Sequence, residues 1–248
     1  MRRRAPGRIA LAILLIAGTG VLVGCADRQR TAPTARTAPT ATARSDPSPR
    51  TATARRRTIA VPPVPAALYA ARLDVRAGPV PVPLQLRIPS LNVDARVLGV
   101  GVTPGDAMDA PEGPVGDPVW QEAFWYRGSA VPGVISTALF AGHIDGPRGT
   151  QAVFAHIDRL RRGDRIIVHD TRSGLDVPFA VTGSTSFSLA QTTEKGVLTQ
   201  MYGVGPVAGT TPQRSVDGLS HLTLVTCAGT FRNGTHDHRL VVFATRIL

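Results

Sequence analysis

The chain has 248 residues, with 28 Lys and Arg against 17 Asp and Glu, a formal net charge of +11, and two cysteines. The excess charge is confined to residues 1–78, which carry 14 basic and three acidic side chains, so that residues 79–248 carry 14 of each. A domain with no net charge lacks the broad basic surface of nucleic-acid-binding proteins, and we expect no nucleic-acid partner.

The N-terminus has the layout of a targeting segment. Arg2–Arg4 and Arg8 precede the apolar run Ile9–Val23, a basic region followed by an apolar region. At about 22 Å the run is short for a membrane span. It ends in Leu22–Cys25, which resembles a bacterial lipobox and makes Cys25 a lipidation candidate. An uncleaved anchor and ordinary cleavage are the alternatives. Each places the domain on the extracytoplasmic face of the membrane or in the cell wall.

Residues 26–78 are rich in Thr, Ala, Pro and Arg and hold few large apolar side chains before Leu68. Such a segment cannot bury enough apolar surface to offset its chain entropy. We predict a disordered linker, with a short helix at Pro62–Leu73. The chain then divides into a targeting segment (1–25), this linker (26–78) and one folded domain (79–248).

The folded domain consists of short, β-branched apolar runs separated by glycine and proline turns, a pattern typical of strands. Helical periodicity is weak, and only residues 152–160 are expected to form one or two turns. The pattern predicts a mainly β domain, a barrel or a sandwich with a few short helices. The expected strands are Leu84–Ile88, Ala95–Val102, Ser136–Ala141, Arg165–His169, Val177–Thr182, Leu222–Cys227 and Leu240–Ala244.

Three residues of this domain are candidates for chemistry. Cys227 ends an expected strand and is the one thiol outside the targeting segment. It is either an inert buried side chain or a nucleophile served by a distant histidine. His143 directly follows another expected strand, and Gly142 beside it permits close approach. Arg239 begins the last apolar run, where it either joins the site or pairs with Asp237 at the surface.

Three sequence pieces together resemble the sortases: Ala141-Gly-His143, Thr223-Leu-Val-Thr-Cys227 and Arg239-Leu-Val-Val-Phe243. The segment Val153–Val168 between them is also similar to that family. The high Arg and Ala content with almost no Lys resembles the actinobacterial class E/F sortases, and class F is our choice. The resemblance implies a closed eight-stranded β-barrel. It also implies that Cys227 is the nucleophile, His143 the general acid/base, and Arg239 the group that positions the substrate or stabilises the oxyanion.

The family further implies a cysteine transpeptidase. It would cleave an LPXTG-like sorting signal between Thr and Gly, hold the protein as a thioacyl intermediate, and transfer it to a cell-wall amine such as that of lipid II. No cofactor is implied. Thr226 and Ala228 flank the nucleophile, and Tyr202 lies in an expected loop, Ser186–Val216, that would form one wall of the groove. We therefore predict that these three contact the substrate.

Other readings of the sequence make different predictions. An L,D-transpeptidase is excluded, because its Ser-His-Gly-Cys motif places His where Val225 stands here. A non-catalytic lipoprotein that binds wall polymer or peptide, and a sortase-fold peptidase that mainly hydrolyses, remain as alternatives. The pair His236 and His238 lacks further ligands at recognisable spacing, and Glu194 stands nearly alone, so we expect no metal site.

Overall fold

The computed structural model describes residues 74–206 and 211–248 of the chain. The predicted targeting segment with Cys25, the predicted helix at 62–73 and nearly all of the predicted linker lie outside the described residues. Among the helices that are described, none has the length and apolar character needed to cross a membrane.

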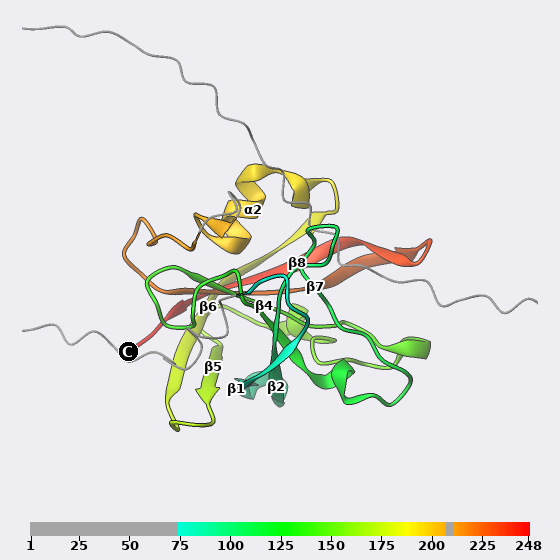
Figure 1. Cartoon of the computed structure of the whole chain (residues 1–248), viewed down its shortest axis with the longest axis horizontal. Coiled ribbons are helices and arrows are strands. Elements are labelled where there is room, and N and C mark those ends of the chain that lie inside the picture. The colour runs from blue at the N-terminus through cyan, green and yellow to red at the C-terminus, as the bar shows by residue number, and fades with distance from the viewer. Residues whose placement is uncertain (1–73, 207–210) are drawn as a thin grey trace, which may run out of the picture. The chain divides into compact units, whose positions relative to one another are not determined.

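Within the described residues, eight strands close into a barrel in the order β1-β2-β3-β4-β7-β8-β6-β5 (Figure 1). This confirms the prediction of a mainly β, closed eight-stranded barrel with a few short helices. The strands are β1 (Val80–Ile88), β2 (Val93–Val100), β3 (Ala123–Tyr126), β4 (Thr137–Ala141), β5 (Arg165–Asp170), β6 (Asp176–Ser188), β7 (His221–Arg232) and β8 (Thr235–Arg246).

The first strand shows how the sequence pattern produces the barrel wall. Leu84, Leu86 and Ile88 are buried, while the residues between them face outward, as the two-residue period of a strand requires. The register of β1 against β2 shifts between Pro81 and Gln85, because the prolines in this stretch lack the N–H that a regular ladder needs.

Strands β3 and β4 and the first half of β7 (residues 222–226) are buried on both faces, because alternate residues enter two different apolar clusters. On β3, Trp125 belongs to the larger cluster, with Phe140 and Phe154, while Phe124 belongs to the smaller one. All four residues of β3 are therefore buried. The sequence analysis did not predict this strand, since its four residues are all apolar and give no alternation.

Two pairs of neighbouring strands run parallel, β2 with β3 and β4 with β7. Parallel neighbours cannot be joined by a tight turn, so the chain must cross over between them. The crossover from β2 to β3 is formed by residues 101–122, hereafter the crossover segment. The parallel pairing of β4 and β7 also brings the C-terminal end of β4, at Ala141, level with Val225 in the middle of β7.

Helices are short and lie between strands. Figure 1 shows α2 (Lys195–Tyr202) on one side of the barrel and the β7–β8 hairpin reaching past the other strands. The expected loop 186–216 thus contains the end of β6, a 3-10 helix and α2. The 3-10 helices are η1 (Pro89–Leu91), η2 (Pro118–Gln121), η3 (Pro147–Gly149), η4 (Ile157–Arg159) and η5 (Gln191–Thr193).

Candidate active site

His143 and Cys227 come together because β4 ends beside the middle of the parallel strand β7. Ala141, the last residue of β4, pairs with Val225, so His143 leaves β4 beside the point where β7 continues to Cys227, which stays paired with β8. The link is extended by two hydrogen bonds: Gly142 N donates to Val225 O at 3.2 Å, and the buried Thr226 Oγ1 donates to Gly142 O at 2.8 Å. The hydroxyl of Thr226 thereby ties β7 to the residue before His143.

Arg239 is brought to the same place by the antiparallel return of β8, where it lies directly opposite Cys227. Its side chain is only 2% exposed. Nη1 donates hydrogen bonds to the carbonyl oxygens of His236 (3.1 Å) and His238 (2.8 Å). The alternative that Arg239 forms a surface ion pair with Asp237 is therefore wrong, because Arg239 is buried and the carboxylate of Asp237 pairs with His238 at 2.7 Å.

The imidazole of His143 is held between two aromatic rings and one backbone carbonyl. Trp120 and Phe124 lie against it, with ring centroids at 4.7 Å and 5.4 Å. Its Nε2 lies 2.9 Å from Pro111 O in the crossover segment. A carbonyl only accepts hydrogen bonds, so Nε2 carries the proton and Nδ1 is the free basic atom of the neutral ring.

The charge state of the pair is set mainly by burial. Burial lowers the pKa of His143, while the hydrogen bond to Pro111 and the charge of Asp145 act in the opposite direction. Burial raises the pKa of Cys227. The positive charge of Arg239 opposes that rise, and the negative charges of Asp145 and Glu112 add to it. A raised thiol pKa and a lowered imidazole pKa mean that both groups are neutral over the range between them.

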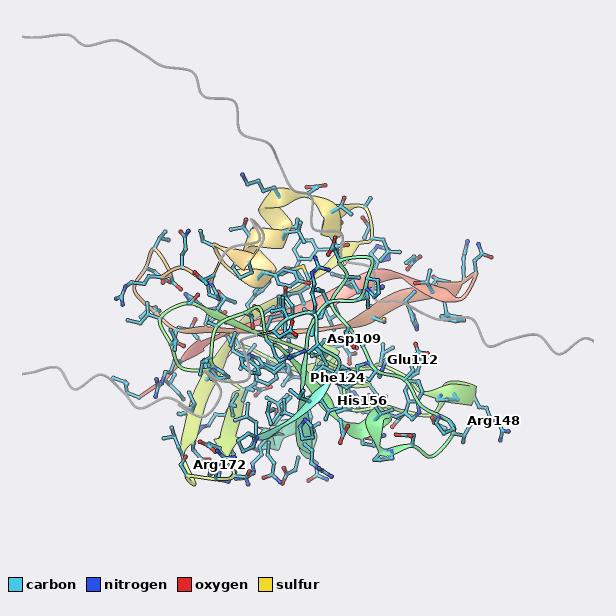
Figure 2. The ribbon with its side chains drawn as sticks, in the orientation of Figure 1. Asp109, Glu112, Phe124, Arg148, His156 and Arg172 are labelled. Atoms are coloured by element: carbon cyan, nitrogen blue, oxygen red, sulfur yellow. The ribbon has the colours of Figure 1, made fainter. Side chains whose placement is uncertain are left out.

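A cavity of about 500 Å³ opens beside these residues. Its floor is formed by the end of β4 and the middle of β7, and its other walls by the crossover segment, the β4–β5 connection (residues 142–164) and the β7–β8 hairpin. Figure 2 shows Arg148 at the outer end of the β4–β5 connection, pointing away from the strands, and Glu112 nearer to Phe124. The charged or titratable residues lining the cavity are Glu112, His143, Asp145, Arg148, Cys227 and His236.

Of the residues predicted from sequence, His143, Thr226 and Cys227 line the cavity, and Arg239 lies opposite Cys227 on β8. The structure does not bring the other two there. Ala228 pairs with His238 on the hairpin, outside the cavity lining. Tyr202 is buried on α2 and packs edge-to-face on Tyr126 at 5.6 Å, in the smaller apolar cluster, so its side chain serves packing.

Sequence reasoning missed several residues of the cavity, namely Glu112, Trp120, Phe124 and Asp145. Asp145 follows His143 by two residues, and this spacing was the one available signal. The sequence of the crossover segment gave no such signal, because the position of this segment at the end of the barrel depends on the parallel pairing of β2 and β3. In residues 74–206 and 211–248, no group of three or more His, Cys, Asp or Glu side chains is arranged to hold a metal ion.

The closed β-barrel gathers a Cys, a His and an Arg where β4 ends, and these are residue types that cysteine acyl transfer uses. Comparison with known families agrees: the family model described as the Sortase domain matches residues 86–247. The chain belongs to the sortase family. Membership supports a sortase-type transpeptidase in general terms.

Solved structures similar to this chain are also sortases. SrtA sortase from Actinomyces oris aligns at 21% identity and a TM-score of 0.46, over 76% of this chain and 87% of its own. Sortase C-1 from Actinomyces oris aligns at 20% identity and a TM-score of 0.46, over 74% and 80%.

Sortase A from Corynebacterium diphtheriae aligns at 16% identity and a TM-score of 0.44, over 67% of this chain and 61% of its own length. The chain thus spans less than two thirds of that protein. Among curated proteins, no sequence matches.

Proposed function

We propose that this protein is a membrane-attached cysteine transpeptidase on the extracytoplasmic side of the membrane. It cleaves an LPXTG-like sorting signal between Thr and Gly and transfers the cleaved protein to a cell-wall amine. The observation that carries the proposal is the convergence, at the end of β4, of His143 and Cys227, which line one cavity, with Arg239, which lies opposite Cys227 on β8.

The acylation step follows from these positions. The thiol of Cys227 loses its proton to Nδ1 of His143, and the thiolate attacks the carbonyl carbon of the Thr–Gly bond, giving a tetrahedral oxyanion. The fixed positive charge of Arg239 favours both the thiolate and the oxyanion. The imidazolium of His143 then protonates the leaving amine, and the protein remains on Cys227 as a thioester.

The environment of His143 fits this exchange of one proton. Trp120 and Phe124 restrict the ring to one plane, and Pro111 O fixes the proton on Nε2, so that Nδ1 is left to serve the thiol. Because both groups are neutral at rest, only a small fraction of the enzyme holds the thiolate–imidazolium pair at any time.

The finer assignments are part of the proposal. The composition supports class E/F, with class F preferred. Attachment to the membrane is through a lipidated Cys25 or an uncleaved N-terminal anchor, and the acceptor is the amine of lipid II or a similar wall precursor.

The test uses the full-length protein, a peptide library of the form Leu-Pro-x-Thr-Gly flanked by varied residues, and an aliphatic amine acceptor. We expect a thioester on Cys227, detected as a mass increase that hydroxylamine removes, followed by amide product. Cys227→Ala is expected to abolish the adduct and the product with unchanged thermal unfolding, since Cys227 is partly exposed.

The alternatives give different outcomes. Peptide binding of equal strength in wild type and Cys227→Ala, with no thioester in either, would establish a non-catalytic binding protein. A thioester that yields only the carboxylic acid, at every amine concentration, would establish a hydrolase.

A further inference from the structure

The residues that precede the first strand lie against the crossover segment. Residues 74–78, hereafter the leading segment, come just before β1. Val102 N, in the crossover segment, donates a hydrogen bond to Val75 O at 2.8 Å. Residue 101 has to be glycine, because a Cβ on Gly101 would overlap Val75 O. The leading segment is thus fastened to the crossover segment, which also reaches the active site.

A buried arginine holds the same segment in place. Arg127 follows β3 directly and is only 2% exposed. Its Nη2 donates hydrogen bonds to Ala77 O and to Gly78 O, the second at 3.0 Å. The side chain passes the end of β2 where a glycine leaves room, since a Cβ on Gly99 would lie 3.2 Å from Arg127 Cδ. Hydrogen bonds from a charged donor are stronger than those between neutral groups, so these two hold the leading segment firmly.

Arg127 also acts on the crossover segment through its charge. Burial lowers the pKa of Arg127, while the negative charges of Asp74 and Asp109 raise it. The guanidinium nevertheless stays charged at any working pH. Asp74 lies in the leading segment. Asp109 lies in the crossover segment, where its N–H donates to Gly101 O at 3.0 Å. One buried cation therefore attracts a carboxylate in each of the two segments.

The crossover segment connects these restraints to His143. Pro111 follows Asp109 by two residues, and its carbonyl oxygen lies 2.9 Å from Nε2 of His143. This contact keeps the proton on Nε2 and leaves Nδ1 for the thiol. A shift of the crossover segment would break the contact. Because a catalytic group displaced by about 1 Å can lose about 100-fold in rate, a support outside the cavity can matter for the chemistry.

We propose that Arg127 is a positioning residue for His143: it clamps the leading segment onto the crossover segment, so that Pro111 O stays against the imidazole. This assignment rests on the proposed transpeptidase function. Arg127 is not among the residues that line the cavity, and it acts on the reaction through the hydrogen bond to Nε2. The stretch of chain that leads into the barrel is then part of the support of the active site.

The test uses two variants of the full-length protein. Gly101→Ala places a methyl group where Val75 O lies, so it displaces the leading segment and keeps Arg127. Arg127→Gln removes the charge. For both we expect kcat/KM on the Leu-Pro-x-Thr-Gly library to fall by about 10- to 100-fold. The loss should lie in kcat and not in KM, since no residue that lines the cavity is changed. Arg127→Lys keeps the charge and should recover part of the activity.

A titration of His143 separates positioning from a loss of stability. Burial lowers the pKa of His143 and the hydrogen bond to Pro111 O raises it, so loss of that bond should lower the pKa further. The acid limb of kcat/KM should then move to lower pH. The imidazole resonances of His143, followed by NMR without substrate, should titrate at lower pH as well. The other charged or titratable groups around the cavity are the same in these variants, namely Glu112, Asp145, Arg148, Cys227, His236 and Arg239.

Amide hydrogen exchange shows whether the leading segment has been released, because Val102 N–H should exchange faster in Gly101→Ala. The matched control is Val177→Ala, which weakens the barrel core on β6. It should lower the urea midpoint and leave kcat and the titration of His143 as in wild type.

Unchanged exchange at Val102 in Gly101→Ala would overturn the assignment, and so would faster exchange with wild-type kcat and wild-type titration of His143. Equal changes in Val177→Ala would overturn it too, since lost stability would then explain them. Gly101→Ala decides the outcome where loss of the buried Arg127 prevents folding. If the wild type cleaved no peptide, the proposed function would fail, and the NMR titration would still decide whether Arg127 positions His143.

Discussion

The two sides of the cavity are built differently. On one side, Thr226 and Cys227 on β7, and Arg239 on β8, belong to a continuous ladder of paired strands. On the other, Glu112 and Asp145 lie on the crossover segment and the β4–β5 connection, outside any long strand. The strand side is more buried, and we propose that it holds the groups that make and break bonds. The loop side is more exposed and holds the acidic charge.

This difference indicates a division of labour. Groups that must meet within tenths of an ångström are placed on paired strands, whose register fixes them. Groups that attract or select a substrate are placed on connections, which tolerate change. His143 stands between the two sides: it lies two residues beyond the end of β4, and its ring is held by the crossover segment and by Phe124 of β3. Changes on the strand side should therefore affect chemistry and stability together, and changes on the loop side should affect pH dependence and acceptor use.

The largest effect is expected from Arg239→Ala. Loss of the charge opposite Cys227 removes support for the thiolate and the oxyanion, and we expect kcat/KM for peptide cleavage to fall by about 100- to 1000-fold. Loss of the buried donor to the carbonyls of His236 and His238 should also lower the free energy of unfolding, by about 2 kcal/mol. Peptide-cleavage kinetics and urea unfolding measure the two effects separately.

Arg239→Lys separates charge from shape. Lysine keeps the charge but lacks the guanidinium Nη1 that donates to the two carbonyls, so activity should recover only in part. An Arg239→Ala protein that is less stable yet cleaves peptide at the wild-type rate would show that the strand side contributes structure alone.

The next effect is expected between the two sides, from Gly142→Ala. A Cβ on residue 142 would lie 2.7 Å from side-chain atoms of Phe154 and Val153, closer than real contacts allow. Moving these packed side chains should cost about 1–3 kcal/mol of stability. His143 is displaced with them, so cleavage should slow as well.

Gly183→Ala on β6 is the matched control, because its Cβ meets no atom within 4 Å and its φ is not positive. We expect its unfolding transition to stay near that of wild type. If Gly142→Ala and Gly183→Ala unfolded alike, the close packing around residue 142 would not be what fixes the position of His143.

A smaller effect is expected from Thr226→Val, which keeps the shape of the side chain but removes the hydroxyl that binds Gly142 O. The carbonyl loses a buried donor, and we expect a stability loss of about 1–2 kcal/mol with a moderate loss in kcat. Thr226→Ser retains the hydroxyl and should restore most of kcat. If Thr226→Val were as active as wild type, the backbone hydrogen bonds between β4 and β7 would suffice to position His143.

The strand side could be predicted from the sequence, and the loop side could not. The β-branched runs located seven of the strands, and the residues at the ends of two of them, His143 and Cys227, line the cavity. The sequence did not predict β3, because Ala123–Tyr126 is apolar throughout. Tyr202 was expected in a substrate loop, but its position on α2 places it in the apolar cluster.

His236 shows why alternation fails at the hairpin. In a regular ladder, residues 239 and 236 would face opposite sides of the sheet, so His236 would be expected away from Cys227. The register shifts between Ala228 and Phe231, and Gly229 within this bulge has a positive φ of 78°. A bulge turns the strand beyond it, and nothing in the spacing of the sequence predicts where it occurs.

The smallest predicted effect tests the loop side by its charge alone. The carboxylate of Asp145 repels the thiolate and attracts the imidazolium, so it raises the pKa of both Cys227 and His143. The negative charge of Glu112 raises the pKa of Cys227 and is not among the causes that shift the pKa of His143. In the pH profile of kcat/KM, the acid limb follows the lower pKa, that of His143, and the alkaline limb follows Cys227.

Asp145→Asn should therefore move both limbs to lower pH, by several tenths of a unit, since the carboxylate is half exposed and screened by salt. Glu112→Gln should move only the alkaline limb, also to lower pH. The measurement is cleavage of one peptide from pH 5 to 10 at constant ionic strength. If the acid limb moved in both variants, or in neither, the two carboxylates would not act separately on the two catalytic groups. If neither limb moved in either variant, the loop side would influence catalysis through its shape and not through its charge.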